Sequence, residues 1–164
     1  MKNLELENNK RAIIIVAHPD DETIWMGGTI LKYPKIEWTI FSLCRAGDKD
    51  RAPKFFKVCK FYGAKGAMTD MEDEGKLGVK ETSQVAHKLI KKIVAGRPFS
   101  YIFTHGANGE YGHLKHIGVH QAVSSLIKNE ELKPETVFYF NYKKISKHNL
   151  EARKDSDLII RLSK

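Results

Sequence analysis

The feature that most constrains this fold is a short apolar run that stops abruptly at a proline. Residues 11–17 read Arg-Ala-Ile-Ile-Ile-Val-Ala, and their β-branched side chains favour a strand. Since the run does not alternate with polar residues, we expect a strand that is buried on both faces, as in a parallel sheet. Pro19 has no amide hydrogen and biases His18 towards extended geometry, so the strand must pass into a loop there.

Strand-like and helix-like segments alternate along the rest of the chain. We expect strands at residues 11–17, 36–44, 67–71, 99–104, 136–142 and 157–162, and helices at residues 22–33, 53–62, 81–95 and from the loop at 105–112 to about 128. Such alternation is typical of a Rossmann-like, doubly wound α/β fold with a mainly parallel sheet flanked by helices. Ligands bind to such folds at the carboxyl ends of the strands.

Length and composition fit one domain better than two. The 164 residues are 41% hydrophobic, and 28 basic against 20 acidic side chains give a formal charge of +8. This excess permits a polyanionic partner without requiring one. A nucleic-acid partner is disfavoured, because basic and aromatic residues do not interleave as in a nucleic-acid-binding module.

Cys44 and Cys59 form no CxxC motif, which favours reduced thiols in a cytoplasmic protein. We expect neither a signal peptide nor a transmembrane segment.

One imidazole and three carboxylates follow the first strand within five residues. These residues are His18, Asp20, Asp21 and Glu22, and the strand before them is too apolar to solvate them. Carboxylates this close repel one another, and a divalent metal ion is the usual compensation. The alternative is structural: Asp20 or Asp21 caps the amides at the start of the next helix. This cluster alone does not decide between the two interpretations.

A second cluster follows the Gly-rich loop at residues 105–112. His113, His116 and His120 occupy positions i, i+3 and i+7, so on a helix they share one face and the first two are neighbours. Imidazole and carboxylate suit zinc, and a catalytic zinc site uses three protein ligands and one open position. Iron, cobalt and manganese also accept these ligands. We expect His120 to be a packed or supporting residue and His87 to be a surface histidine.

Four stretches of the chain together resemble the PIG-L/LmbE family of zinc-dependent N-deacetylases. They are Ala17-His-Pro-Asp-Asp-Glu22, Gly27-Gly-Thr29, Cys44-Arg-Ala-Gly-Asp48, and Asn108-Gly-Glu-Tyr-Gly-His113 followed by His116. The family includes de-N-acetylases of N-acetylglucosaminyl-phosphatidylinositol and the deacetylases of mycothiol and bacillithiol synthesis. The likeness runs from about Ile13 to Val123. It implies an LmbE-like α/β fold and a hydrolase that acts on a small amino-sugar conjugate.

The resemblance implies a metal centre with a base beside it. The zinc ligands would be His18, Asp21 and His116. Two neutral imidazoles and one carboxylate leave zinc with net positive charge, which can lower the pKa of a water molecule to ~7. Asp20, beside the metal but not bound to it, would accept the proton of that water and return it to the departing amine. Such acid–base catalysis contributes on the order of 10²–10⁴-fold in rate.

The resemblance also implies residues that bind the substrate. His113 would polarise the substrate carbonyl or stabilise the oxyanion, with help from Tyr111. Loss of one such donor typically costs ~10²–10³ in rate. Arg51 would bind polar groups of the substrate, and Asn108 would line the same pocket.

The chain departs from the family pattern in two places. The second family motif reads His-Pro-Asp-His, whereas Leu114 and Lys115 stand between the two histidines here. A lysine cannot orient or charge His113 as the family aspartate would, and if it lay close it would disfavour a protonated ring. Asp20, Glu110 or another carboxylate could compensate. The second departure is length: we expect residues 1–164 to form a single deacetylase-like domain that lacks a C-terminal segment found in relatives.

The sequence therefore predicts a zinc-dependent hydrolase that removes an N-acetyl group from an N-acetylglucosamine-type sugar conjugate. Two alternatives stay open. One is a metal hydrolase for another amide or an ester. The other is a catalytically weak module that binds an anionic sugar conjugate or nucleic acid, which the replacement at residues 114–115, the short C-terminus and the positive charge motivate. A homo-oligomer is compatible with each of these functions.

Overall fold

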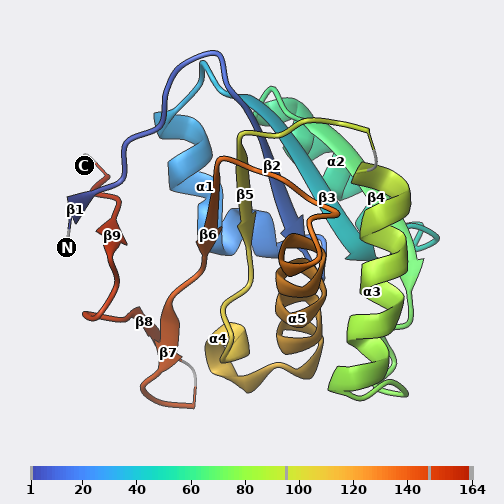
Figure 1. Cartoon of the computed structure of the whole chain (residues 1–164). Coiled ribbons are helices and arrows are strands. Elements are labelled where there is room, and N and C mark those ends of the chain that lie inside the picture. Colours follow the sequence, from blue (N-terminus) through green and yellow to red (C-terminus); the bar gives the residue numbers. More distant parts are fainter. Residues whose placement is uncertain (1, 95, 148, 163–164) are drawn as a thin grey trace.

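A five-stranded parallel sheet forms the centre of the computed structural model, which describes residues 2–94, 96–147 and 149–162 (Figure 1). Its strands are β2 (Arg11–Val16), β3 (Glu37–Cys44), β4 (Lys65–Met71), β5 (Tyr101–Thr104) and β6 (Thr136–Tyr139). They lie in the order β4-β3-β2-β5-β6, and every neighbouring pair is parallel. The predicted doubly wound α/β fold is confirmed.

The winding direction of the sheet changes between β2 and β5. From β2 the chain moves outward through β3 to β4, and it then returns to place β5 on the other side of β2. Ile14 of β2 accordingly lies between Ile40 of β3 and Phe103 of β5. In open α/β sheets, ligands bind in the crevice at such a point, outside the carboxyl ends of the strands. The loops after β2 and β5 therefore border the expected site.

Helices cover both faces of the sheet (Figure 1). One layer is α1 (Asp21–Lys32) with α2 (Arg51–Phe61), and the other is α3 (Val79–Val94) with α5 (Leu114–Lys128). Alternate side chains of β2 enter the two layers: Ile14 packs with α1 and α2, whereas Ile13 and Ile15 pack with α3 and α5. Burial on both faces explains why the apolar run of β2 is uninterrupted.

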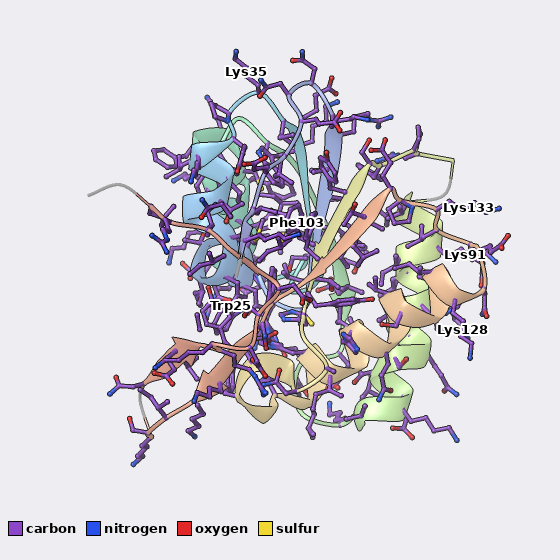
Figure 2. The ribbon with its side chains drawn as sticks, turned by 60° about the vertical axis from the view of Figure 1, so that its left-hand side comes forward. Trp25, Lys35, Lys91, Phe103, Lys128 and Lys133 are labelled. Atoms are coloured by element: carbon purple, nitrogen blue, oxygen red, sulfur yellow. The ribbon has the colours of Figure 1, made fainter. Side chains whose placement is uncertain are left out.

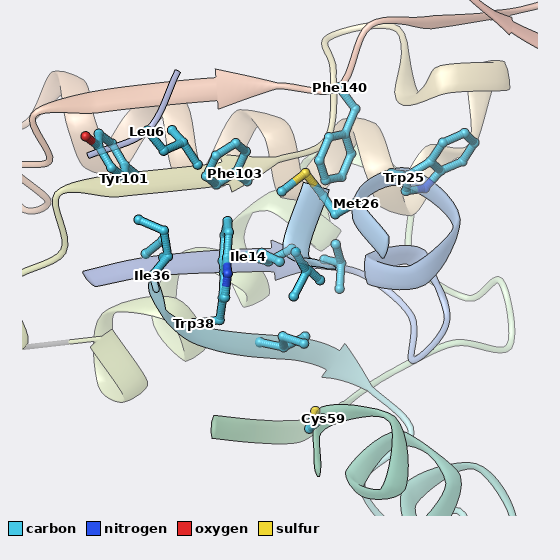
Figure 3. Packing of buried hydrophobic residues seen from close by; sticks show 14 of the residues in the cluster. Leu6, Ile14, Trp25, Met26, Ile36, Trp38, Cys59, Tyr101, Phe103 and Phe140 are labelled. Atoms are coloured by element: carbon cyan, nitrogen blue, oxygen red, sulfur yellow. The ribbon is translucent and has the colours of Figure 1, made fainter. Parts of the chain in front are cut away.

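Large aromatic side chains fill the layer between the sheet and α1. Figure 3 shows Trp38 and Phe103 close to Ile14, with Trp25 of α1 near Phe140. The ring centroids of Trp38 and Phe103 are 5.6 Å apart. Because such a core is close-packed, it holds the amino end of α1 in a fixed place relative to β2.

The terminal strands differ from the sequence expectation. The strand expected at 157–162 is only β9 (Leu158–Ile159), and it pairs with β1 (Lys2–Asn3) outside the main sheet. The strand expected at 136–142 ends at Tyr139, and β7 (Tyr142–Lys144) pairs antiparallel with β8 (Leu150–Ala152). These short strands are largely exposed, so no hydrophobic pattern marks them. Position 95, the expected end of the third helix, lies outside the described residues.

Most of the lysines that make the chain basic lie on its surface, whereas Lys115 is buried. Figure 2 shows Lys35, Lys91 and Lys133 pointing outward, whereas Trp25 lies among the packed elements. Lys91 forms an ion pair of 2.6 Å with Glu131. In the part of the chain that the structure describes, no helix is both long enough and apolar enough to cross a membrane.

Candidate metal centre

Three side chains from two distant segments of the chain meet at the carboxyl end of β2. His18 follows β2, Asp21 begins α1, and His116 lies in the first turn of α5, 98 positions from His18. Nδ1 of His18 is 3.3 Å from Oδ2 of Asp21 and 3.3 Å from Nε2 of His116, and the latter two atoms are 3.4 Å apart. Tetrahedral zinc with bonds of ~2.0–2.1 Å separates its ligand atoms by ~3.3–3.4 Å. The triangle of ligand atoms therefore fits a zinc ion.

Each of the two imidazoles uses its other nitrogen on a carboxylate. Nε2 of His18 donates to Oδ1 of Asp73 at 2.9 Å, and Nδ1 of His116 donates to Oε2 of Glu110 at 2.6 Å. Contacts of this kind fix the tautomer of a metal-binding histidine. With both protons held there, two ring nitrogens and the Asp21 carboxylate face one another as lone-pair donors. They repel unless a cation lies between them.

The two buried carboxylates of this site are ionised. Burial raises the pKa of Glu110, but hydrogen bonds from His105 and His116 outweigh this effect and bring the pKa to about 2. Burial also raises the pKa of Asp21, yet this pKa lies well below its ordinary value, and the carboxylate accepts hydrogen bonds from the amide of His18 at 2.9 Å and from Nε1 of Trp25 at 3.1 Å. Since an ionised carboxylate can only accept hydrogen bonds, Nδ1 of His116 is the donor to Glu110.

Glu110 reaches the two rings because the backbone of α4 (Gly109–Gly112) is distorted. Its φ angle is 59°, in the left-handed region that non-glycine residues rarely adopt. The conformation turns the carboxylate back onto the amide of Gly106, which donates at 2.8 Å. Strain of this kind is typical of functional sites, where the surrounding contacts hold it in place.

His105 is a supporting residue that the sequence analysis missed. Its Nδ1 donates to Glu110 at 2.9 Å, and its Nε2 accepts the amide of Ala17 at 3.0 Å. One nitrogen atom of its ring also lies within 4.8 Å of ligand atoms of Asp21 and His116. Because both ring nitrogens already have partners, however, His105 has no lone pair left for a metal ion. Its place directly after the strand beside β2 was the only available signal.

Asp73 is a second residue that the analysis missed. It lies in the loop between β4 and α3, where its Oδ2 accepts a hydrogen bond from Nε of Arg45 at 2.6 Å. Cys44 lies close to His18 and Asp73 and could in principle complete another metal site. Burial raises the pKa of this thiol to about 12, so it keeps its proton at neutral pH. In the sequence, Asp73 was only one of several acidic residues in a turn.

His113 and Tyr111 lie beside the triangle of ligand atoms. The His113 ring centroid is 4.9 Å from that of His18 and 5.6 Å from that of Tyr111. Burial, followed by the neighbouring rings of His116 and His18, lowers the pKa of His113 to about 4, so the ring is neutral at pH 7. Its Nδ1 is buried without a hydrogen-bond partner among the described residues, and a bound ligand would satisfy it. Burial raises the pKa of Tyr111, so the phenol keeps its proton.

A cavity of about 430 Å³ opens beside these residues. Its lining includes His18, Asp20, Asp21, Arg45, Arg51, Asp73, Tyr111 and His113. Asp20 and Arg51 form an ion pair of 3.0 Å with side chains that are 46% and 49% exposed, so both are accessible to a ligand. The side chain of Asp20 makes no capping hydrogen bond to α1, which counts against the capping alternative for this residue.

Asn108 does not line this cavity. Its Oδ1 accepts the amide of Glu110 at 3.3 Å, and its Nδ2 donates to the carbonyl of Tyr142 at 2.8 Å. The side chain therefore stabilises the loop that positions Glu110. Asn108 lines a neighbouring, more apolar cavity instead. The expectation that it shares a pocket with Tyr111 is corrected here.

Lys115 and His120 lie close to His113 and His116 in the sequence. In the structure their side chains contact other residues. Lys115 is buried and forms an ion pair of 2.7 Å with Glu72. Nδ1 of His120 lies 3.0 Å from the carbonyl oxygen of His105, and its ring packs against Tyr139 at 4.8 Å. His120 is thus a packed residue of α5, outside the triangle of ligand atoms.

The fold and this site define an α/β protein with a histidine–carboxylate centre at its topological switch point. The family described as PIG-L, GlcNAc-PI de-N-acetylase, matches residues 13–127. The chain therefore belongs to this family. A curated relative from Thermobifida fusca (strain YX), 1D-myo-inositol 2-acetamido-2-deoxy-alpha-D-glucopyranoside deacetylase, is 28% identical over 156 residues, covering 70% of this chain and 53% of the relative. The chain thus spans about half the length of this relative.

Solved structures confirm the fold. The antimicrobial reagent A40926 pseudoaglycone deacetylase Dbv21 has a TM-score of 0.65 at 13% identity, over 90% of this chain and 71% of that one. GalB, the 4-carboxy-2-hydroxymuconate hydratase from Pseudomonas putida KT2440, has a TM-score of 0.59 at 14% identity, also over 90% and 71%. Since these neighbours carry out different reactions, the fold alone does not define an activity.

Proposed function

We propose that this chain is a zinc-dependent N-deacetylase for an N-acetylglucosamine-type conjugate. The observation that carries the proposal is the triangle formed by His18 Nδ1, Asp21 Oδ2 and His116 Nε2, with edges of 3.3, 3.3 and 3.4 Å. Membership of the PIG-L family and the Thermobifida fusca relative support an acetylated amino sugar as the substrate. When bound, the ion would supply a Lewis acid that polarises the acyl oxygen and makes water more acidic.

Asp20 is suited to carry the proton in this reaction. It lines the cavity, and its side chain is 46% exposed, so water and substrate reach it. Water adds to the acetyl carbonyl while Asp20 accepts one proton from it. Asp20 then returns the proton to the nitrogen as the C–N bond breaks, which gives acetate and a free amine.

His113, Tyr111 and Arg51 are suited to hold the acetylated sugar. At pH 7 His113 is a neutral ring and Tyr111 keeps its phenol proton, so both can donate hydrogen bonds to a developing oxyanion. The Arg51 guanidinium faces the cavity from the start of α2, where it pairs with Asp20. A hydroxyl group of the sugar would bind there and leave Asp20 free to take up the proton.

Metal analysis together with product analysis tests the proposal. Purified protein should contain about one zinc per chain. It should release acetate and primary amine in equal amounts from 1D-myo-inositol 2-acetamido-2-deoxy-alpha-D-glucopyranoside. His116→Ala should lose both the metal and the activity, because it removes one of three ligands.

The matched control is His87→Ala, which replaces a histidine that pairs with Glu131 on another side of the molecule. It should retain metal and activity. Absence of a transition metal from wild-type protein, after incubation with zinc as well as before, would refute the metal centre. Bound zinc with no acetate from any N-acetylglucosaminide would refute the deacetylase and favour a binding module.

A further inference from the structure

Lys115 is a buried lysine that lies on α5 between His113 and His116. Its side chain is 5% exposed, and it lies on α5 directly before His116. The ammonium group crosses to the loop between β4 and α3, where it contacts Oε2 of Glu72 at 2.7 Å and the main-chain carbonyl of the same residue. A buried lysine is expensive unless it is paired, so this contact has a structural role.

Glu72 organises the loop that Lys115 contacts. Its Oε1 accepts the amides of Glu74 and Lys76, the latter at 3.1 Å, and its Oε2 accepts the amide of Leu77 at 3.2 Å. One carboxylate therefore closes the turn over residues 72–77. The hydrogen bond from Lys115 is the largest influence on Glu72 and helps bring its pKa to about 2.

The next residue in this loop, Asp73, fixes the orientation and the tautomer of the His18 ring. Oδ1 of Asp73 accepts the proton on Nε2 of His18 at 2.9 Å, which leaves Nδ1 free to face Asp21 and His116. A shift of the loop would move Asp73 and release the His18 ring. Lys115 thus joins the helix that carries His116 to the loop that orients His18.

We propose that Lys115 is a positioning residue that sets the orientation and tautomer of His18 through Glu72 and Asp73. The inference deepens the proposed function, on which it rests for the part about zinc affinity. The chain places the cation of this ion pair on α5 and the anion on the facing loop. The departure at Lys115 is therefore compatible with an ordered metal centre.

The test compares Lys115→Met and Lys115→Arg with wild type in metal-free protein. Long-range ¹H–¹⁵N spectra report which nitrogen of His18 carries the proton. Wild type should show it on Nε2. Lys115→Met should show a mixture of tautomers, and hydrogen exchange at the Lys76 and Leu77 amides should accelerate at least ~10-fold as the turn opens.

Zinc affinity gives a second readout. Lys115→Met should bind zinc ~10–100-fold more weakly, the usual effect of removing support from a metal ligand. Lys115→Arg should recover most of the wild-type behaviour because it keeps the charge. Lys91→Met is the matched control: it breaks the exposed pair with Glu131 and should alter none of these readouts.

A second variant keeps the test decisive if Lys115→Met fails to fold. Glu72→Gln leaves the lysine in place, weakens the turn and should shift His18 in the same way. A His18 tautomer and loop exchange equal to wild type in the folded variant would overturn the proposal. Since these readouts need no metal, a wild-type protein that binds no zinc would refute the proposed function while still testing the role of Lys115.

Discussion

Two histidines of this chain become metal-ligand candidates through the position of their protons. His18 donates from Nε2 to Asp73, and His116 donates from Nδ1 to Glu110. His105 has nearly the same surroundings, yet an amide and a carboxylate occupy both of its nitrogens. The difference between a ligand and a supporting residue therefore lies in one hydrogen bond, which a sequence pattern does not contain.

Asp20→Asn isolates the proposed proton carrier. Asparagine has nearly the same shape but accepts no proton at neutral pH, so kcat should fall by on the order of 10²–10⁴-fold. The zinc content should stay at the wild-type level because Asp20 lies outside the triangle of ligand atoms. Acetate release and metal analysis on the same preparation check both expectations.

The control for this variant is Asp50→Asn, which removes an exposed carboxylate that pairs with Lys54. It should leave kcat within about 2-fold of wild type, since surface substitutions away from special features have small effects. Wild-type kcat in Asp20→Asn would contradict the role of Asp20. Loss of zinc in that variant would instead make Asp20 part of the metal site.

Sequence reasoning identified the residues with distinctive surroundings and missed those defined only by folding. His18, Asp21 and His116 stand in dense polar clusters after predicted strands, and the structure brings them together. Asp73 and His105 were overlooked because an acidic turn and a single histidine after a strand are common. Their partners are 55 and 88 positions away, at His18 and Ala17.

The helix α5 shows why close packing matters to the site. It carries His113, Lys115 and His116 near its start, and it packs along α3 on one face of the sheet. A Cβ atom at Gly118 would lie 2.5 Å from Cγ2 of Thr82 on α3. Since the clash is with a buried side chain, the two helices can approach this closely only with glycine at position 118.

Gly118→Ala should destabilise the protein by ~1–3 kcal/mol, the usual cost of overpacking a core. In a free helix, alanine instead stabilises the helix by ~1 kcal/mol relative to glycine. The sign of the change in the free energy of unfolding therefore distinguishes a close helix contact from an unconstrained helix. Urea unfolding curves of the two proteins measure it. The double variant Gly118→Ala with Thr82→Ala should regain only part of the loss, because it removes the Cγ2 methyl group but keeps the Cβ atom of residue 82, which would lie 2.7 Å away. Equal or greater stability of the single variant would refute the close helix contact.

Elements were predictable in proportion to their burial. The strands β2 and β3 and the helices carry long apolar patterns, and their predicted bounds agree with the structure to within about two residues. The short strands β7 and β8 are mostly exposed and rely on main-chain pairing, which leaves no periodicity to detect. The prediction of a final strand at residues 157–162 was wrong for the same reason.

At the scale of the whole molecule, the topology of the sheet assembles the site. β2 and β5 are neighbours in space, although helices and two further strands separate them along the chain. Their loops bring His18 and Asp21 to His116 at the one edge where parallel strands all end. The chain spans about half the length of its curated relative, and this half contains all three proposed ligands.

Zinc-edge anomalous diffraction from crystals grown with zinc tests the central claim most directly. The account predicts one strong peak with Nδ1 of His18, Oδ2 of Asp21 and Nε2 of His116 each at ~2.0–2.2 Å. The rings should keep their contacts with Asp73 and Glu110. A peak held by other side chains, or crystals without a peak at saturating zinc, would contradict the account.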